Sequence, residues 1–254
     1  MSGHSKWHSI RRSKGILDNK RGALFTQIAR EITVPVREGG GGDQNANFRL
    51  RVVLQKAKAA NMPSDNIDRA IKRGLGNVEG EAQDEEITYE GYGPGGCAIL
   101  VKALTNNRNR TASEVRSAFT KGGGNLGELG SVGWMFQRRG VIQIEIGKHD
   151  VEEPELAAID AGADDVTETT DEDENPILEV YTTFEDWKKV QEAFDKEGFN
   201  TISSEDVMQP TTTMDLPQEK TLQALKLIDR LEELDDVQNV YTNLNISDEV
   251  AAMS

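Results

Sequence analysis

The hydrophobic periodicity of this 254-residue sequence changes once, across residues 75–85. Before this segment, apolar residues recur every three or four positions, which is the period of an amphipathic helix. After it, short runs rich in β-branched and aromatic residues alternate with helical patterns, which indicates strands and helices in the same domain. The segment itself is rich in glycine and acidic residues, so it is predicted to be a linker. The expected fold class is therefore α+β, with an all-helical part at the N-terminus.

Three short helices are predicted before the linker. The first starts near residue 17; Pro35 lacks an N–H group, so this helix is expected to stop or kink near Thr33, and Gly39–Gly42 ends it. The second is predicted at 47–61, with Asp43, Asn45 and Asn47 as candidate caps, and the third runs from a Ser64 cap to Gly74.

Two strands, 87–92 and 97–104, are predicted around a glycine-rich turn after the linker. Thr111 and Glu114 have capping-box spacing, so a helix is expected to start near residue 112 and to end at Gly122–Gly124. Residues 134–138 and 140–146 are predicted to form a hairpin. The remaining pattern predicts a helix at 151–161, strands at 164–169 and 177–182, a helix at 184–197, a strand at 199–207, a helix at 218–234 and a strand at 237–241.

The order of these elements predicts an inserted domain. Residues 133–207 contain enough strands and helices to close on themselves, whereas the strands and helix of 86–122 need the last helix and strand as partners. We therefore predict a basic helical domain at 1–76 and an α+β domain formed by 82–130 plus 212–246. A second α+β domain, 131–211, is inserted into it, and both α+β domains are expected to be ferredoxin-like.

Charge is divided unevenly along the chain. Residues 1–73 hold 15 Lys and Arg against 6 Asp and Glu, a balance of +9, whereas the whole chain carries −15, which leaves −24 for residues 74–254. A basic segment on an acidic body attracts a polyanion to one place and repels it elsewhere. The alternative, a solvated helical charge pattern, explains the asymmetry less well, so nucleic-acid binding is predicted. The candidate contacts in this segment are Lys6, Trp7, Arg11, Arg12, Lys14, Lys20 and Arg21, with Trp7 stacking on a base or a sugar.

A second contact is predicted at Arg108 and Arg110, which directly precede the expected helix. Two guanidinium groups beside the N–H groups of a helix N-terminus form an anion site, although the same arginines equally well pair with the acidic body. A sequence-reading helix-turn-helix is not favoured, because the segment around Gly39–Gly42 is longer than the tight turn of that motif.

The sequence shows no set of residues that predicts catalysis, a metal or a cofactor. The three histidines are His4, His8 and His149, and the i, i+4 spacing of the first two has no neighbouring ligand to complete a metal shell. Residues 150–175 hold 12 acids and no Lys or Arg, but without the spacing of a calcium loop. Cys97, the single cysteine, is predicted to be a buried strand residue. A chain with one cysteine cannot form a disulfide scaffold. We expect a cytoplasmic protein, because no apolar segment resembles a signal peptide or a membrane span.

Six motifs together resemble those of one known family. They are Gly3-His4-Ser5-Lys6-Trp7, Ala60-Asn61-Met62-Pro63, Asp65-Asn66-Ile67, Tyr89-Glu90-Gly91-Tyr92-Gly93-Pro94-Gly95-Gly96, Asn107-Arg108-Asn109-Arg110-Thr111, and Gly123-Gly124-Asn125-Leu126-Gly127 through Gly130-Ser131-Val132. In this order they closely resemble the YebC/PmpR family, whose mitochondrial relative is the translational activator of cytochrome oxidase. The likeness extends over residues 2–245. Val34-Pro35-Val36 and Asp43-Gln44 depart from the family pattern, which affects where the first helix ends.

This resemblance implies a three-domain protein without enzymatic activity, cofactor or small-molecule substrate. Bacterial members are described as DNA-binding transcriptional regulators, and the organellar relative and some bacterial members as translation factors at the ribosome. The residues themselves do not choose between DNA and ribosomal RNA, and they leave the oligomeric state open. Two further alternatives are a nuclease whose carboxylates hold a divalent ion, and a scaffold whose acidic domains bind a basic protein.

Overall fold

The computed structural model describes residues 19–39, 41–76, 84–147, 151–170 and 175–246, with the backbone alone for 19–23. The described residues form two compact units, one made of residues 136–209 and the other of the remaining described residues. They contain seven α-helices and two four-stranded antiparallel sheets, so the α+β class is confirmed. The three domain boundaries, including the one between the helical part and the sheet that follows, stay a prediction.

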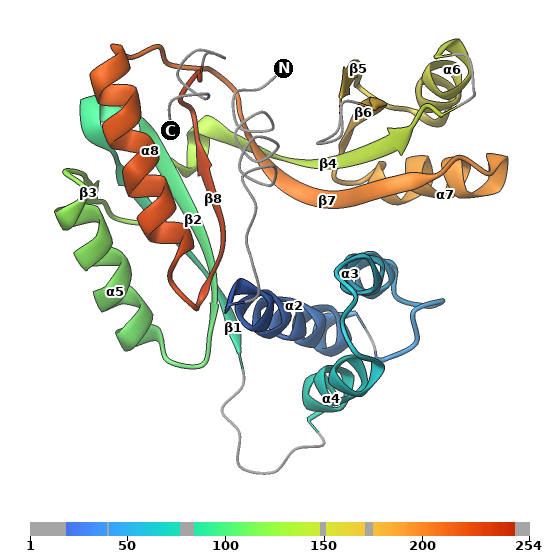
Figure 1. Cartoon of the computed structure of the whole chain (residues 1–254), viewed down its shortest axis with the longest axis horizontal. Helices are drawn as coiled ribbons and strands as arrows, with labels where there is room; N and C mark the ends of the chain where they lie inside the picture. The colour runs from blue at the N-terminus through green and yellow to red at the C-terminus, as the bar shows by residue number, and fades with distance from the viewer. Residues whose placement is uncertain (1–18, 40, 77–83, 148–150, 171–174, 247–254) are drawn as a thin grey trace. The chain divides into compact units, whose positions relative to one another are not determined.

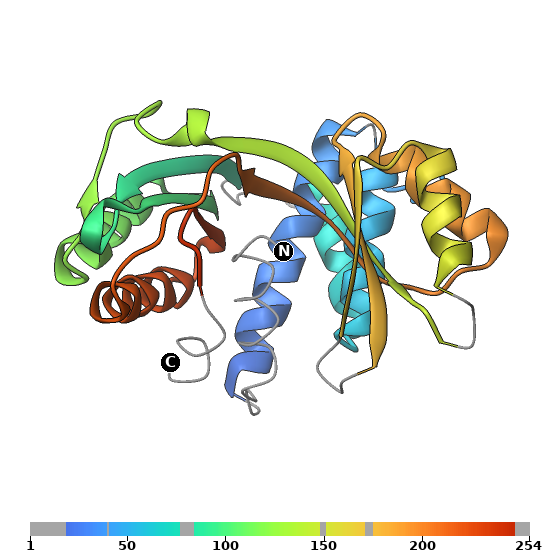
Figure 2. The same ribbon diagram turned by 90° about the horizontal axis from the view of Figure 1, so that it is seen from above.

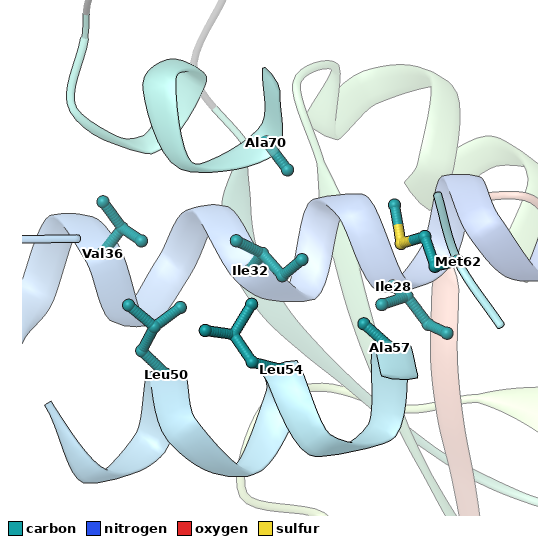
Figure 3. Packing of buried hydrophobic residues seen from close by; sticks show 8 residues of the cluster. All are labelled: Ile28, Ile32, Val36, Leu50, Leu54, Ala57, Met62 and Ala70. Carbon is teal, nitrogen blue, oxygen red and sulfur yellow. The ribbon is translucent and has the colours of Figure 1, made fainter. Parts of the chain in front are cut away.

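The helical part of the larger unit consists of α2 (Asn19–Glu38), α3 (Phe48–Ala59) and α4 (Ser64–Gly74). Figure 3 shows its core, in which α2 supplies Ile28, Ile32 and Val36 at a spacing of four residues. Leu50, Leu54 and Ala57 of α3 pack against these side chains, together with Met62 and with Ala70 of α4. Apolar burial on one stripe of each helix thus holds the three helices together, since helices as short as α3 and α4 are marginal alone.

The first helix does not stop near Thr33. It continues through Pro35 to Glu38, and the N–H of Gly39 still donates to the Pro35 carbonyl at 2.8 Å. Val36 lies beyond the proline and is buried in the helical core, so packing holds the last turn in place despite the lost N–H group. Of the candidate caps for α3, Asn47 is the one used, and in α4 Ser64 is the first helical residue after Pro63 at the cap position.

The sheet of the larger unit has the order β3-β1-β2-β8, with β1 (Glu85–Tyr92), β2 (Ala98–Thr105), β3 (Asn125–Leu126) and β8 (Val237–Thr242). Pro94–Gly96 forms a 3-10 turn between β1 and β2. Helices α5 (Arg108–Lys121) and α8 (Gln218–Glu232) lie side by side against the sheet, as Figure 1 shows. Cys97 is fully buried, as predicted, but lies directly before β2 and not within it, and burial raises the pKa of its thiol to about 11.

Helix α5 starts one turn earlier than the predicted capping box. The cap is Asn107, whose side chain accepts the N–H of Arg110 at 3.1 Å. The hydroxyl of Thr111 points instead to Thr105 Oγ1 and to a carboxylate oxygen of Asp236. The prediction that Thr111 starts the helix was therefore wrong, because its hydroxyl is occupied by a distant partner.

The smaller unit runs in the order β4 (Phe136–Glu145), α6 (Glu152–Ala161), β5 (Asp165–Thr170), β6 (Pro176–Thr183), α7 (Trp187–Glu197) and β7 (Thr201–Pro210). Its sheet has the order β5-β6-β4-β7, which is the ferredoxin-like arrangement of a βαββαβ chain. Both helices lie on one face of this sheet and contact each other (Figure 2). The unit lies between β3 and α8 in the sequence, so its chain is inserted into that of the larger unit.

The predicted hairpin around residue 139 is a single continuous strand. Arg139 and Gly140 pair with Thr183 and Thr182 within β4, and residues 133–135 form a short 3-10 helix. Gly140 resembles a turn residue in the sequence, but glycine stands there because the surrounding side chains leave no room for a Cβ atom. A Cβ atom there would lie 2.4 Å from a ring carbon of Trp187 and 2.6 Å from the Thr182 hydroxyl.

Candidate nucleic-acid interface

The opening segment of the predicted interface lies outside the described residues. Lys6, Trp7, Arg11, Arg12 and Lys14 belong to it. Lys20 and Arg21 lie in the first turn of α2, where the structure describes the backbone but not the side chains. Their role as nucleic-acid contacts stays a prediction.

Several basic residues of the helical part are paired with acids. Lys56 of α3 holds both carboxylate oxygens of Glu31 at 3.0 Å, and Arg49 lies 3.2 Å from Glu38 and 3.6 Å from Glu86. Such pairs are only half-exposed and reduce the charge available to a ligand.

Three exposed cations of the helical part have no acidic partner within 4 Å among the described residues. They are Lys58 near the end of α3, and Arg69 and Lys72 on α4. Residues three apart on a helix lie on the same side, so Arg69 and Lys72 present their charge together. Sequence reasoning counted these residues in the charge balance but did not single them out. The amphipathic pattern of α4 does contain the signal, because Ile67, Ala70 and Ile71 face the core.

The predicted second contact divides into one exposed and one engaged arginine. Arg108, the first residue of α5, leaves 69% of its side chain exposed and only approaches Glu85, at 3.7 Å. Arg110 donates from Nη2 to Oδ2 of Asp236 at 2.6 Å, so this arginine pairs with the acidic body, as the alternative expectation held. The structure does not bring the two guanidinium groups onto one common partner.

Asp236 is the most heavily bonded carboxylate of this region, and its side chain is 1% exposed. Its Oδ2 accepts from Arg110, from the Thr111 hydroxyl at 2.7 Å and from the Thr105 hydroxyl at 3.0 Å. Its Oδ1 accepts from Nη1 of Arg30 in α2 at 2.6 Å. Burial by itself raises the pKa of Asp236, but the hydrogen bonds from Arg110, Thr111 and Thr105 and the charge of Arg30 together lower it.

Further polar contacts join α2 to strand β8, and α2 and α4 to the residue directly before β1. The amide of Gln27 donates to the carbonyls of Val237, at 3.3 Å, and Gln238, at 2.9 Å. Arg37 donates to the main-chain oxygen of Asp84 at 2.6 Å, and Arg73 lies 3.3 Å from the carboxylate of that residue. Sequence reasoning did not predict this set of contacts, because the partners are distant in the chain.

A second buried carboxylate, Glu90, holds the glycine-rich loop 127–133. It accepts the main-chain N–H groups of Gly130, Val132 and Gly133 at 2.6–2.8 Å. Burial raises the pKa of Glu90, but these three hydrogen bonds together bring it below its usual value.

The loop held by Glu90 and the residue that follows it present two apolar side chains at the surface. Leu129 is 84% and Trp134 74% exposed, and the indole N–H donates to the Ser131 carbonyl at 3.2 Å. Most of the surface of both side chains is therefore open to solvent.

The described residues contain no group of three His, Cys, Asp or Glu side chains arranged to hold a metal ion. The histidines His4, His8 and His149 all lie outside those residues, so the absence of a metal site stays a prediction. Among the helices described here, none is long and apolar enough to cross a membrane.

Comparison with known proteins gives matches along nearly the whole chain. Residues 5–77 match the model of the TACO1/YebC protein N-terminal domain, and residues 84–244 match that of the TACO1/YebC second and third domain. A protein of Chloroflexus aurantiacus is 53% identical over 99% of this chain and 98% of its own length, and one of Syntrophomonas wolfei is 50% identical over 99% of both. Each carries the name "Probable transcriptional regulatory protein". The crystal structure of a conserved hypothetical protein from Aquifex aeolicus matches with a TM-score of 0.81 at 43% identity, covering 91% of this chain and 93% of that one.

Proposed function

The chain belongs to the TACO1/YebC family, and on that basis we propose that it is a non-enzymatic, nucleic-acid-binding regulator of gene expression. The observation that carries the proposal is the charge division between +9 in residues 1–73 and −24 in the rest, together with three exposed cations of the helical part that have no acidic partner among the described residues. The names of the relatives support a regulator of transcription, and we infer that the nucleic acid it binds is DNA.

In this proposal the cations act by neutralising phosphates. Lys58, Arg69 and Lys72 join the basic opening segment as backbone contacts, and Arg108 adds a contact from α5. Each neutralised phosphate releases counterions, so binding weakens as salt rises. The acidic remainder of the chain repels the polyanion and confines it to the basic part.

A translation factor that binds ribosomal RNA is the second candidate. The observation that favours it is the connection between α2 and α3, since the first ends at Glu38 and the second starts at Phe48. A helix-turn-helix that reads bases in the major groove uses a turn of three or four residues. Contacts to phosphates alone serve a structured RNA as well as a duplex.

A competition experiment separates the two candidates. The full chain is titrated with a promoter duplex, a scrambled duplex, structured ribosomal RNA and intact ribosomes, across a range of salt. A preference for one duplex over its scrambled form at physiological salt supports the transcriptional regulator. Tight ribosome binding with weak, sequence-independent DNA binding supports the translation factor, and no binding to any of the four contradicts the proposal.

A further inference from the structure

We propose that the face of the helical part that carries Arg30, Arg37 and Arg73 is a second phosphate-binding face, occupied by acids and carbonyls directly before β1 and β8 until nucleic acid displaces them. This inference rests on the proposed function, because it assumes that the helical part binds a polyanion. It goes beyond that function by naming the residues of a concealed site and the competing partners that control access to this site.

The partners of these arginines are the kind of oxygen atoms that a phosphate would supply. Arg30 donates from Nη1 to Asp236 Oδ1 at 2.6 Å and to the main-chain oxygen of Asp235 at 3.0 Å. Arg37 donates to the main-chain oxygen of Asp84, and Arg73 pairs with its carboxylate. Guanidinium groups bind carboxylates and phosphates through the same planar set of N–H donors, so a phosphate can take the place of either acid.

The two oxygens of Asp236 serve different parts of the structure. Oδ2 accepts from Arg110, Thr105 and Thr111, all of which belong to β2 and α5 of the sheet part. Oδ1 accepts from Arg30 of the helical part. If Arg30 leaves, the carboxylate keeps a guanidinium and two hydroxyl groups, so it is not left as an uncompensated buried charge. Arg30 is therefore the partner that can be exchanged.

Asp84 also makes a weak attachment to the helical part. Its carboxylate is buried but accepts no hydrogen bond among the described residues, and Arg73 lies 3.3 Å away as its ionic partner. A buried carboxylate with an ion pair but without hydrogen bonds is poorly compensated. An incoming phosphate at Arg73 therefore competes with an ion pair to Asp84 in which the carboxylate accepts no hydrogen bond among the described residues.

The concealed face is continuous with the exposed cations. Arg69 and Arg73 are four residues apart on α4, and Lys72 lies between them, so a backbone bound at Arg69 and Lys72 lies within one helical turn of Arg73. The nucleic acid thus reaches the edge of the concealed face first. Binding is weakened by the fraction of molecules in which that face is occupied by acids.

The test compares two neighbouring substitutions with the same charge change. Asp236→Asn weakens the partner of Arg30, whereas Asp235→Asn removes the same negative charge at an exposed side chain. Both substitutions are made in a chain that carries Arg110→Ala, because Asp236 also pairs with Arg110, itself a candidate nucleic-acid contact. We expect Asp236→Asn to bind a short DNA duplex or an RNA hairpin roughly three- to tenfold more tightly than Asp235→Asn, because more molecules expose the face. Equal affinities of the two variants would overturn the inference.

A neutral substitution repeats the test if Asp236→Asn does not fold. Gln27→Ala removes the donors to the Val237 and Gln238 carbonyls without any change of charge. It is expected to increase affinity in the same direction, and an unchanged affinity counts against the concealed face.

A distance measurement on the full chain tests the displacement directly. Fluorophores are placed at Gln55→Cys on α3 and Thr120→Cys on α5, both at exposed positions, while the buried Cys97 stays unlabelled. Saturating duplex or hairpin is expected to lower energy transfer between them. Binding with unchanged transfer overturns this inference and leaves the proposed function intact, whereas absence of binding contradicts both.

Discussion

At the scale of single residues, two buried carboxylates organise the larger unit. Glu90 collects three main-chain N–H groups of one loop, and Asp236 collects two arginines and two threonines. Neither was singled out by sequence reasoning. The sequence does not distinguish a buried, hydrogen-bonded acid from an exposed one. The arginine partners of Asp236 lie 206 and 126 residues away in the chain.

The first prediction concerns Glu90. The substitution Glu90→Gln is expected to lower the free energy of unfolding by about 1–3 kcal/mol, because hydrogen bonds to a charged group are lost while Gln cannot accept all three N–H groups. Thermal or urea unfolding measures it. Glu128→Gln, at an exposed position of the same loop, is the control and is expected to change stability by less than about 0.5 kcal/mol.

The same variant gives a pH prediction. The pKa of Glu90 is below its usual value in the folded protein, so its contribution to stability is complete above the unfolded pKa of about 4.3 and is lost as the pH falls through the folded value. The stability difference between wild type and Glu90→Gln should therefore shrink below about pH 4.3. A difference that stays constant down to the acid limit of folding would exclude an ionised Glu90 as its source.

At the scale of elements, Asn47 joins the end of α2 to the start of α3. Its Oδ1 accepts the Leu50 N–H at 3.1 Å, which caps α3, and its Nδ2 donates to the Pro35 carbonyl at 2.6 Å. The sequence predicted a cap among three residues of similar propensity. It could not show that one of them must also donate to the end of the preceding helix, which selects asparagine over aspartate.

The second role of Asn47 is tested with Asn47→Asp. Aspartate caps helices as well as asparagine does, so a role in capping alone predicts little change. We expect a loss of about 1–3 kcal/mol in unfolding free energy, because a buried carboxylate would face the Pro35 carbonyl without a donor. Asn45→Asp, at an exposed position, is the control. Equal stability of the two variants would show that the contact to α2 contributes nothing.

At the scale of the whole molecule, strong local patterns predicted most of the elements. The helices of the first part and the α+β class follow from the change of period, and the insertion follows from the order of elements. The single strand β4 was missed because a distant partner decides it, and the start of α5 was missed because Asn107 caps the helix while the Thr111 hydroxyl is engaged elsewhere. Trp187 requires a glycine at position 140, and Asp236 occupies the Thr111 hydroxyl.

The predictability of the interface divides in the same way. The charge asymmetry is visible in the sequence, and Arg108 and Arg110 were predicted as one site with pairing to acids as the equal alternative. Whether Arg110 pairs with an acid was left open. Lys58, Arg69 and Lys72 could be identified as candidate contacts only after the structure showed which neighbouring cations are paired with acids. Charge along a sequence indicates that a polyanion is attracted, but only the folded contacts show which cations are already neutralised.

The measurement that tests the central claim most directly is the salt dependence of nucleic-acid affinity in a charge-reversed variant. Lys58→Glu, Arg69→Glu and Lys72→Glu are combined in one chain. The matched control combines Lys189→Glu, Lys196→Glu and Lys226→Glu, which reverses three exposed cations outside the helical part.

We predict that the helical-part variant binds duplex DNA or structured RNA much more weakly. The slope of log affinity against log salt should be smaller in magnitude by about 2–3, as expected for three lost phosphate contacts. The control should keep a slope close to that of the unmodified chain. Equal slopes for the two variants would contradict the assignment of nucleic-acid binding to these residues of the helical part.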